Sequence, residues 1–253
     1  MPLRTRTVME RITLVVVLPS VAGSINAAGL LEVGVPTSHM TGTVSQIGEQ
    51  LALGNLATTG FALGLVTAFF CGATVAALLV KSERADTTSR YAAACLIEVV
   101  ALALFGLICS VKGWRAAAPP VLVTGLLSFA MGLQNALVTR ISNAAVRTTH
   151  VTGIITDVAV ELVRVVRLLR QGLAVRTDPE YLKLELHVAI FVSFLAGATL
   201  GPLGFQHFGY GWLLAPIAVL LALAALDVGR LVAGEPSVEM AARPALGTPV
   251  KPA

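Results

Sequence analysis

Long apolar stretches alternate with short polar connections along the chain. Six of them have about the length of a membrane span, and they cover residues 12–33, 57–80, 91–111, 119–139, 186–204 and 211–231. A helix needs about twenty apolar residues to cross the hydrocarbon core of a bilayer. The pattern therefore predicts six transmembrane helices and not a β-barrel, whose strands are typically alternating segments of about ten residues.

The composition points to the same class of protein. Of the 253 residues, 56% are hydrophobic and 13% are charged, whereas soluble domains carry about a quarter charged residues. The net charge of +4 does not indicate a nucleic-acid partner, because an unequal distribution of Lys and Arg across a membrane explains it. We expect an all-α polytopic membrane protein whose main partner is the lipid bilayer.

The positions of the basic residues predict the orientation. With the N-terminus inside, only Lys112 and Arg115 of the 18 basic residues fall on the outer side, as the positive-inside rule requires. We expect a multi-pass protein of the inner (plasma) membrane with both termini cytoplasmic. The basic, then apolar start is similar to a signal peptide, but the first span has a counterpart later in the chain, and we interpret it as a span.

Three short sequences recur in the same order. GSINA at 23–27 matches GLQNA at 132–136, TSHMTG at 37–42 matches TTHVTG at 148–153, and AFFCGAT at 68–74 matches SFLAGAT at 193–199. The second copy gains about fourteen residues, which fall in a predicted loop at 171–185. Three matches in register predict an internal duplication.

The number of spans in each copy sets the relative orientation of the copies. Three is odd, so the second copy is inverted, as in several transporter families. The predicted fold is six transmembrane helices in two inverted three-helix repeats, with broken or short helices after spans one and four. The expected divisions are a cytoplasmic N-terminus (1–11), a first repeat (12–111), an outer loop (112–118), a second repeat (119–232) and a disordered cytoplasmic tail (233–253).

The motifs also carry a resemblance to a known family. The Gly-x-x-Asn-Ala span, the Ser-His-x-Thr-Gly element that follows it and six spans with a Glu in the third are similar to the YoaK family of bacterial integral membrane proteins, over roughly residues 12–232. The resemblance implies the six-span fold and a permease-like annotation, and it implies no established activity. This chain has Thr-Gly-Thr where relatives often carry Thr-Gly-Asn, so no role of that Asn is transferred.

Each Thr-Gly motif is predicted to interrupt a helix. Thr41 and Thr152 are candidate caps of the helices that follow, and Thr43 with Gln46 matches a capping box in the first copy. The first new helix has about twelve residues and would reach only ~18 Å. The second would place its later half at the inner interface, with its arginines directed toward lipid phosphates. A broken helix inside a membrane presents free N–H groups, which favour an anion or a carboxylate.

Polar residues near the breaks and inside the spans are the candidate substrate or ion pathway. They are Asn26, Thr37, Ser38, His39, Thr41, Gly42, Glu98, Asn135, Thr148, Thr149, His150, Thr152 and Gly153. The Asn residues and hydroxyls would contact solute, and Glu98 or a His would carry a proton, since an intramembrane carboxyl group is a functional candidate. Structural alternatives remain open. The Asn residues would then only hydrogen-bond across helices, the His residues would lie at an aqueous rim, and Gly60, Gly64, Ala68, Gly72, Gly197 and Gly201 would form packing faces.

Signals for other chemistry are weak. No P-loop, nucleophile elbow or dinucleotide fingerprint occurs, and Cys71, Cys95 and Cys109 form no zinc pattern. We expect no enzyme, no metal and no cofactor. The leading hypothesis is a small secondary transporter or permease of a small solute that works as a monomer or homodimer, with proton coupling as an option. The alternatives are a non-transporting membrane assembly or sensor protein and, with the least support, an intramembrane enzyme.

Overall fold

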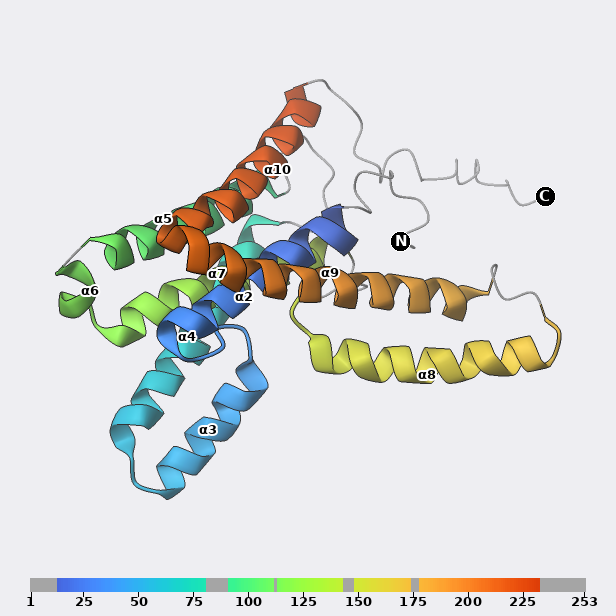
Figure 1. The fold of residues 1–253 in the computed structure, drawn as a ribbon, viewed down its shortest axis with the longest axis horizontal. Coiled ribbons are helices and arrows are strands. Elements are labelled where there is room, and N and C mark those ends of the chain that lie inside the picture. Colours follow the sequence, from blue (N-terminus) through green and yellow to red (C-terminus); the bar gives the residue numbers. More distant parts are fainter. Residues whose placement is uncertain (1–12, 81–90, 112, 143–147, 174–177, 233–253) are drawn as a thin grey trace, which may run out of the picture.

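The computed structural model describes residues 13–80, 91–111, 113–142, 148–173 and 178–232, and it is helical (Figure 1). The main helices are α2 (Leu18–Val33), α3 (Met40–Ala52), α4 (Leu56–Leu79), α5 (Ala92–Ser110), α7 (Pro120–Ile141), α8 (Val151–Arg170), α9 (Pro179–Phe208) and α10 (Leu214–Val232). Short elements join them: the π-helix η2 (Thr13–Val17), α6 (Trp114–Ala117) and the 3-10 helix η3 (Gly209–Leu213). The predicted terminal segments 1–11 and 233–253 lie outside the described residues. So does Lys112, one of the two basic residues placed on the outer side, and so do Lys81, Arg84, Arg90, Arg147 and Arg176, which were counted on the inner side.

Within the described residues, five segments are long and apolar enough to cross a membrane. They are Val15–Val33, Leu56–Leu79, Ala92–Ser110, Pro120–Arg140 and Tyr181–Gly229. The last segment has 49 residues, and it contains both α9 and α10, between which the chain turns at η3 (Figure 1). The chain is therefore a multi-pass membrane protein by the length and composition of its helices.

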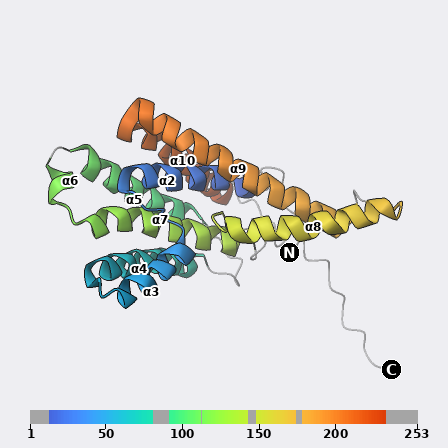
Figure 2. The ribbon, with the colours of Figure 1, turned by 60° about the horizontal axis from the view of Figure 1, so that its bottom comes forward.

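Two tightly packed helix pairs form the centre of the molecule. The most extensive contacts join α4 to α7 and α2 to α9. The two pairs meet where α2 crosses α7, and α5 packs against α7 and α10 (Figures 1 and 2). Fully buried apolar side chains fill the crossing, among them Ala22, Ile25, Leu127, Ala130 and Met131. This part of the core is close-packed.

Glycines allow the paired backbones to approach closely. A Cβ atom at Gly23 would overlap the Phe194 carbonyl oxygen, and a Cβ at Gly132 would overlap the Phe69 carbonyl oxygen. Under the correspondence of the repeated sequences, these two contacts are equivalent. The same holds for two further contacts, in which Gly197 lies against the Ser20 carbonyl and Gly72 against the Phe129 carbonyl. Small residues at such crossings are typical of membrane helix pairs.

The packing faces expected from the sequence are found in part. Gly72, Gly197 and Gly201 each face a backbone carbonyl of a neighbouring helix, and Gly64 faces the Val121 side chain. Gly60 is exposed and has open space around it, so its inclusion in the packing face was wrong. At Gly60, in the second turn of α4, no described residue lies within contact distance of an added Cβ atom.

The prediction of a loop at 171–185 is also wrong for residues 179–185, which are helical. The helix α9 already begins at Pro179, and it includes Lys183 and Glu185. Those charged residues lowered the apparent hydropathy, but α9 extends beyond the apolar stretch because α8 packs alongside it (Figure 2). A 30-residue helix is roughly 45 Å long, which exceeds the hydrocarbon core of a bilayer.

Candidate functional site

Asn26 ties the chain segment between α2 and α3 back onto α2. The helix α2 ends at Gly34, whose φ of 74° is the left-handed conformation that glycine tolerates. The chain then reverses, and the Asn26 Oδ1 atom accepts hydrogen bonds from the Ser38 N–H at 3.0 Å and the Ser38 hydroxyl at 2.8 Å. The Thr37 hydroxyl donates a third, longer bond of 3.4 Å to the same atom.

Asn135 makes the equivalent contacts in the second copy. Its Oδ1 atom accepts from the Thr149 N–H at 3.2 Å and from the Thr148 hydroxyl at 3.1 Å. Its Nδ2 atom donates to the Thr149 hydroxyl at 2.6 Å and to the Met131 carbonyl at 2.9 Å. Both Asn residues therefore fix the start of the next helix, and the hydroxyls expected to contact solute are partners in this network.

The burial of the motif residues is the same in both copies. Thr37 and Thr148 are 0% exposed, whereas His39 and His150 are exposed. Among the other hydroxyl residues of the candidate pathway, Ser38 and Thr149 are half-buried, and Thr41 and Thr152 are exposed. The buried Thr of each motif thus contacts only protein, whereas the His and the Thr that follows it are accessible.

The helices after the breaks begin without the predicted caps. The helix α3 starts at Met40 and α8 starts at Val151, after His39 and His150, and neither start has a side-chain cap hydrogen bond. The prediction that Thr41 and Thr152 cap them was wrong, because both residues already lie inside the helices. The Thr43 hydroxyl donates to the His39 carbonyl at 3.1 Å, so it forms no capping box with Gln46.

The motif glycines make room for the histidine rings. A Cβ atom at Gly42 would overlap the His39 imidazole, and a Cβ at Gly153 would overlap the His150 imidazole. Each ring therefore lies over the first turn of the helix that follows it. This contact explains why both copies place a Gly three residues after the His.

The structure does not bring all candidate residues to one place. The Gln134 Nε2 atom donates to the Leu18 carbonyl at 3.1 Å, and Leu127 lies beside Gly29, so α2 and α7 run antiparallel. In this register Asn26 lies opposite the region of Ser128, and Asn135 lies roughly 10 Å farther along α7. The helices α3 and α8 leave the bundle in different directions, and their main contacts are with α4 and α9 (Figure 1).

Glu98 forms a separate polar position inside the bundle. It lies on α5 and is 0% exposed, and neither of its carboxyl oxygens has a hydrogen-bond partner among the described residues. Native proteins rarely leave buried polar atoms without partners. An intramembrane carboxyl group of this kind is suited to bind and release a proton.

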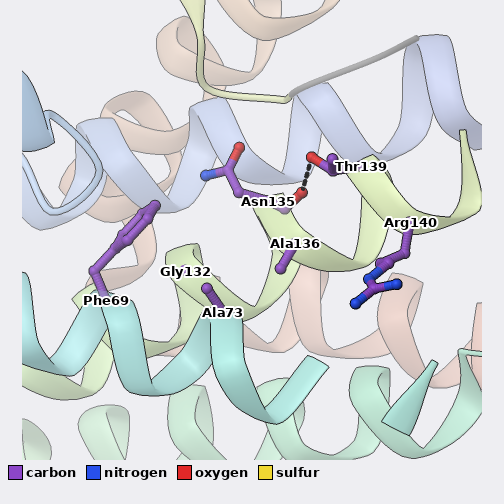
Figure 3. A pocket seen from close by; sticks show the side chains of 7 residues that line it. All are labelled: Phe69, Ala73, Gly132, Asn135, Ala136, Thr139 and Arg140. Carbon is purple, nitrogen blue, oxygen red and sulfur yellow. Dashed lines mark hydrogen bonds between the residues drawn. The ribbon is translucent and has the colours of Figure 1, made fainter. Parts of the chain in front are cut away.

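A pocket of about 300 Å³ lies between α4 and α7 beside Asn135 (Figure 3). Ala73 of α4 and Ala136 of α7 lie in its middle, with Phe69 near one end and Arg140 near the other. Gly132 and Thr139 complete the lining. The sequence reasoning did not identify this pocket, because it depends on the close approach of two helices that are distant in the chain.

Four further polar contacts were also missed. Asp227 of α10 accepts hydrogen bonds from the Tyr91 and Ala92 N–H groups at 3.2 and 3.1 Å, at the start of α5. The Glu161 carboxylate of α8 lies 3.0 Å from the His187 Nδ1 atom of α9. The Tyr210 hydroxyl donates to Glu32, and the Trp212 Nε1 atom donates to Ser24. An acidic residue inside an apolar span is a signal that sequence reasoning could have used for Asp227. Nothing in the sequence indicates its partners, the backbone N–H groups of Tyr91 and Ala92.

No metal centre is formed by the side chains that the structure describes. Within those ranges, no group of three or more His, Cys, Asp or Glu side chains is placed to hold a metal ion. Polar chemistry is therefore divided among the two Asn-centred networks, Glu98 and the α4–α7 pocket.

Comparison with known proteins identifies a family. The chain is 29% identical over 145 residues to the "UPF0700 transmembrane protein YoaK" of Bacillus subtilis (strain 168), an alignment that covers 56% of this chain and 63% of the relative. The chain thus matches less than two thirds of the length of that relative. No solved structure matches. The family model "Protein of unknown function (DUF1275)" matches residues 14–226, and the chain therefore belongs to the DUF1275 family of membrane proteins.

Proposed function

We propose that the protein is a small secondary transporter with six spans in two inverted three-helix halves. The observation that carries this proposal is the equivalence of the two halves in their contacts. Gly23 and Gly132 approach the carbonyls of Phe194 and Phe69, and Asn26 and Asn135 tether equivalent loops. Inverted repeats with interrupted helices are a recurrent plan of secondary transporters.

The sixth span of this plan is α10. The apolar segment from Tyr181 to Gly229 is roughly 74 Å long as a continuous helix, more than twice the thickness of the hydrocarbon core. The turn at η3 divides it into α9 and α10. With six spans, the basic residues segregate to one side, which supports cytoplasmic termini in the inner membrane.

Alternating access in this proposal is a relative movement of two helix pairs. The α2–α9 pair and the α4–α7 pair are each held by close backbone contacts, so each would move as a unit. The crossing of α2 and α7 between them is filled with apolar side chains, which corresponds to a closed conformation. The exposed motif residues His39 and His150 would line the openings on opposite sides.

Glu98 is the proposed proton carrier. Its carboxyl group is buried without a hydrogen-bond partner, and α5 connects α7 of one pair to α10. A movement that admits water to this carboxyl group would allow protonation and release. Asn26 and Asn135 act as positioning residues here, because their side chains hold the interrupted helices in place.

The test is solute flux into liposomes that contain the purified protein, with and without a pH gradient. We expect Glu98→Gln to abolish the stimulation by the gradient, and Asn26→Ala to lower flux by loosening the first break. The matched control is Glu49→Gln on the exposed face of α3, which should leave flux unchanged. Gradient-stimulated flux that persists in Glu98→Gln would exclude this residue as the proton carrier.

A non-transporting assembly or sensor protein is the second candidate. The close packing at the crossing of α2 and α7 favours it, since two halves that only pack need no central passage. A solute screen without flux, together with a stable partner or homodimer in mild detergent, would support this alternative.

A further inference from the structure

The pocket between α4 and α7 is mostly apolar in its lining. Phe69, Ala73, Gly132 and Ala136 present carbon atoms, and they lie in a row between the two helices (Figure 3). The pocket is open at the surface of the described chain, and Phe70, which follows Phe69 on α4, lies on an exposed face of the helix and is 68% exposed. In a membrane, such a face contacts acyl chains, so the pocket is accessible from the lipid phase.

Two of the three polar residues in the lining have no free hydrogen-bond donor to offer an anion in the pocket. Asn135 uses its Oδ1 atom for Thr148 and Thr149 and both Nδ2 hydrogens for Thr149 and Met131. The Thr139 hydroxyl donates to the Asn135 carbonyl at 2.7 Å. The remaining polar group is the Arg140 guanidinium.

Arg140 is exposed at the end of α7. It makes no ion pair or hydrogen bond with another residue in the part of the chain that the structure describes, although a guanidinium group carries five N–H donors. The pocket therefore combines an apolar channel with one positive charge at its end that has no partner among the described residues. This combination fits an amphiphile with an acyl chain and an anionic head.

The corresponding position in the first copy has no such charge. Under the sequence correspondence, Leu30 and Leu31 stand where Thr139 and Arg140 stand in the second copy. Both leucines are exposed, so the first copy has apolar side chains at these two positions. If the repeated fold itself required a positive charge here, both copies would carry one. Only the second copy does, so we attribute the charge to the α4–α7 pocket and not to the repeat.

We propose that the α4–α7 pocket binds an anionic phospholipid. Part of one acyl chain lies along Ala73 and Ala136, and the headgroup phosphate accepts hydrogen bonds from Arg140. The bound lipid covers the apolar seam between α4 and α7 next to the Asn135 tether. It is a structural ligand of this helix pair and is distinct from the transported solute.

The test measures lipid selectivity at the pocket by fluorescence quenching. The full chain carrying Phe69→Trp is reconstituted in vesicles that contain brominated phosphatidylglycerol or brominated phosphatidylcholine, and the signal of the wild-type protein is subtracted. We expect the anionic lipid to be preferred by about fivefold, the contribution of one basic residue near a charged lipid surface. Arg140→Gln should reduce the preference to about one, and Arg140→Lys should retain part of it.

Two controls separate the pocket from the general surface. Phe70→Trp places the reporter on the neighbouring exposed face of α4, where both lipids should quench alike. Arg164→Gln removes an exposed charge of α8, and it should leave the preference at Phe69→Trp unchanged. Equal quenching by both lipids at Phe69→Trp overturns the proposal, and so does a preference that survives Arg140→Gln or appears equally at Phe70→Trp. A loss of stability in Arg140→Gln without a change in lipid preference would assign Arg140 to the end of α7 instead.

Discussion

The α3–α4 and α8–α9 hairpins begin in the same way and then diverge. Both follow an Asn-tethered loop, a His at the helix start and a Gly under the imidazole ring. The helix α3 has 13 residues and no basic residue, whereas α8 has 20 residues and carries Arg164, Arg167 and Arg170. The residues that the two copies share therefore fix the start of each helix, whereas the length and charge of that helix differ between the copies.

The α8–α9 hairpin differs from the α3–α4 hairpin in both length and charge. The helix α9 has 30 residues and α4 has 24, so the second hairpin extends farther from the central crossing (Figure 2). Its extension is held by the Glu161–His187 contact between α8 and α9. The first hairpin has Gln50 and Ala62 at the corresponding positions, which cannot form that pair.

The largest effects are expected at the close contacts that the two halves share. Gly23→Ala and Gly132→Ala each place a methyl group against a backbone carbonyl, and overpacking of this kind costs about 2 kcal/mol. Both variants should lower the free energy of unfolding in detergent by similar amounts, measured by reversible denaturation. Gly60→Ala, where the structure has open space, is the control. A large loss in only one of the two glycine variants would break the equivalence of the halves.

The two Asn tethers are expected to differ when the amide is replaced by a carboxylate. Asn26→Ala and Asn135→Ala should each destabilise by about 2 kcal/mol, because buried partners lose their hydrogen bonds. Asn26→Asp keeps the acceptor that Ser38 uses, whereas Asn135→Asp loses two donated bonds and faces the Met131 carbonyl. Thermal unfolding should therefore rank Asn135→Asp below Asn26→Asp in stability, and the opposite rank would contradict the hydrogen-bond assignment.

The Glu161–His187 contact is expected to contribute less, because it lies at the edge of the bundle. A double-mutant cycle with Glu161→Ala and His187→Ala should give a coupling energy of about 1 kcal/mol. The same cycle with Asp157→Ala, an exposed residue of α8, should give none. A coupling energy near zero for both cycles would mean that the longer second hairpin is not stabilised by this pair.

The smallest effects are expected at the hydroxyls that the sequence indicated as caps. Thr41 and Thr152 are exposed inside their helices, and their replacement by Ala should change stability by less than about 0.5 kcal/mol. Unfolding measurements on the two variants check this, and a loss near 1 kcal/mol would restore the capping interpretation. A loss of flux at unchanged stability would instead place these hydroxyls on the solute pathway.

Hydropathy predicted the positions of most helices because burial in lipid demands long apolar segments. The first four spans were placed within a few residues of η2–α2, α4, α5 and α7. The fifth was not, because its start depends on packing against α8 and not on its own hydropathy. Lys183 and Glu185 lie in α9 even though their charges are typical of a loop.

The motif was recognised from its repetition, but its contacts were not. The bond from Ser38 to Asn26 spans twelve residues, and it forms only because the chain reverses after Gly34. Sequence spacing alone does not indicate such a reversal, so solute contact and hydrogen bonding across helices both remain open for the Asn residues at the level of sequence. In the same way, no local pattern indicates that Phe69 and Arg140 line one pocket.

The contact between Asp227 and the start of α5 has a consequence for biosynthesis. The Asp227 carboxylate accepts hydrogen bonds from the backbone of Tyr91 and Ala92, which precede it by 136 and 135 residues. During translation, α5 enters the bilayer long before its acceptor leaves the ribosome. The first turn of α5 therefore cannot make these two hydrogen bonds until the final helix is inserted, and a chain truncated before α10 would never make them.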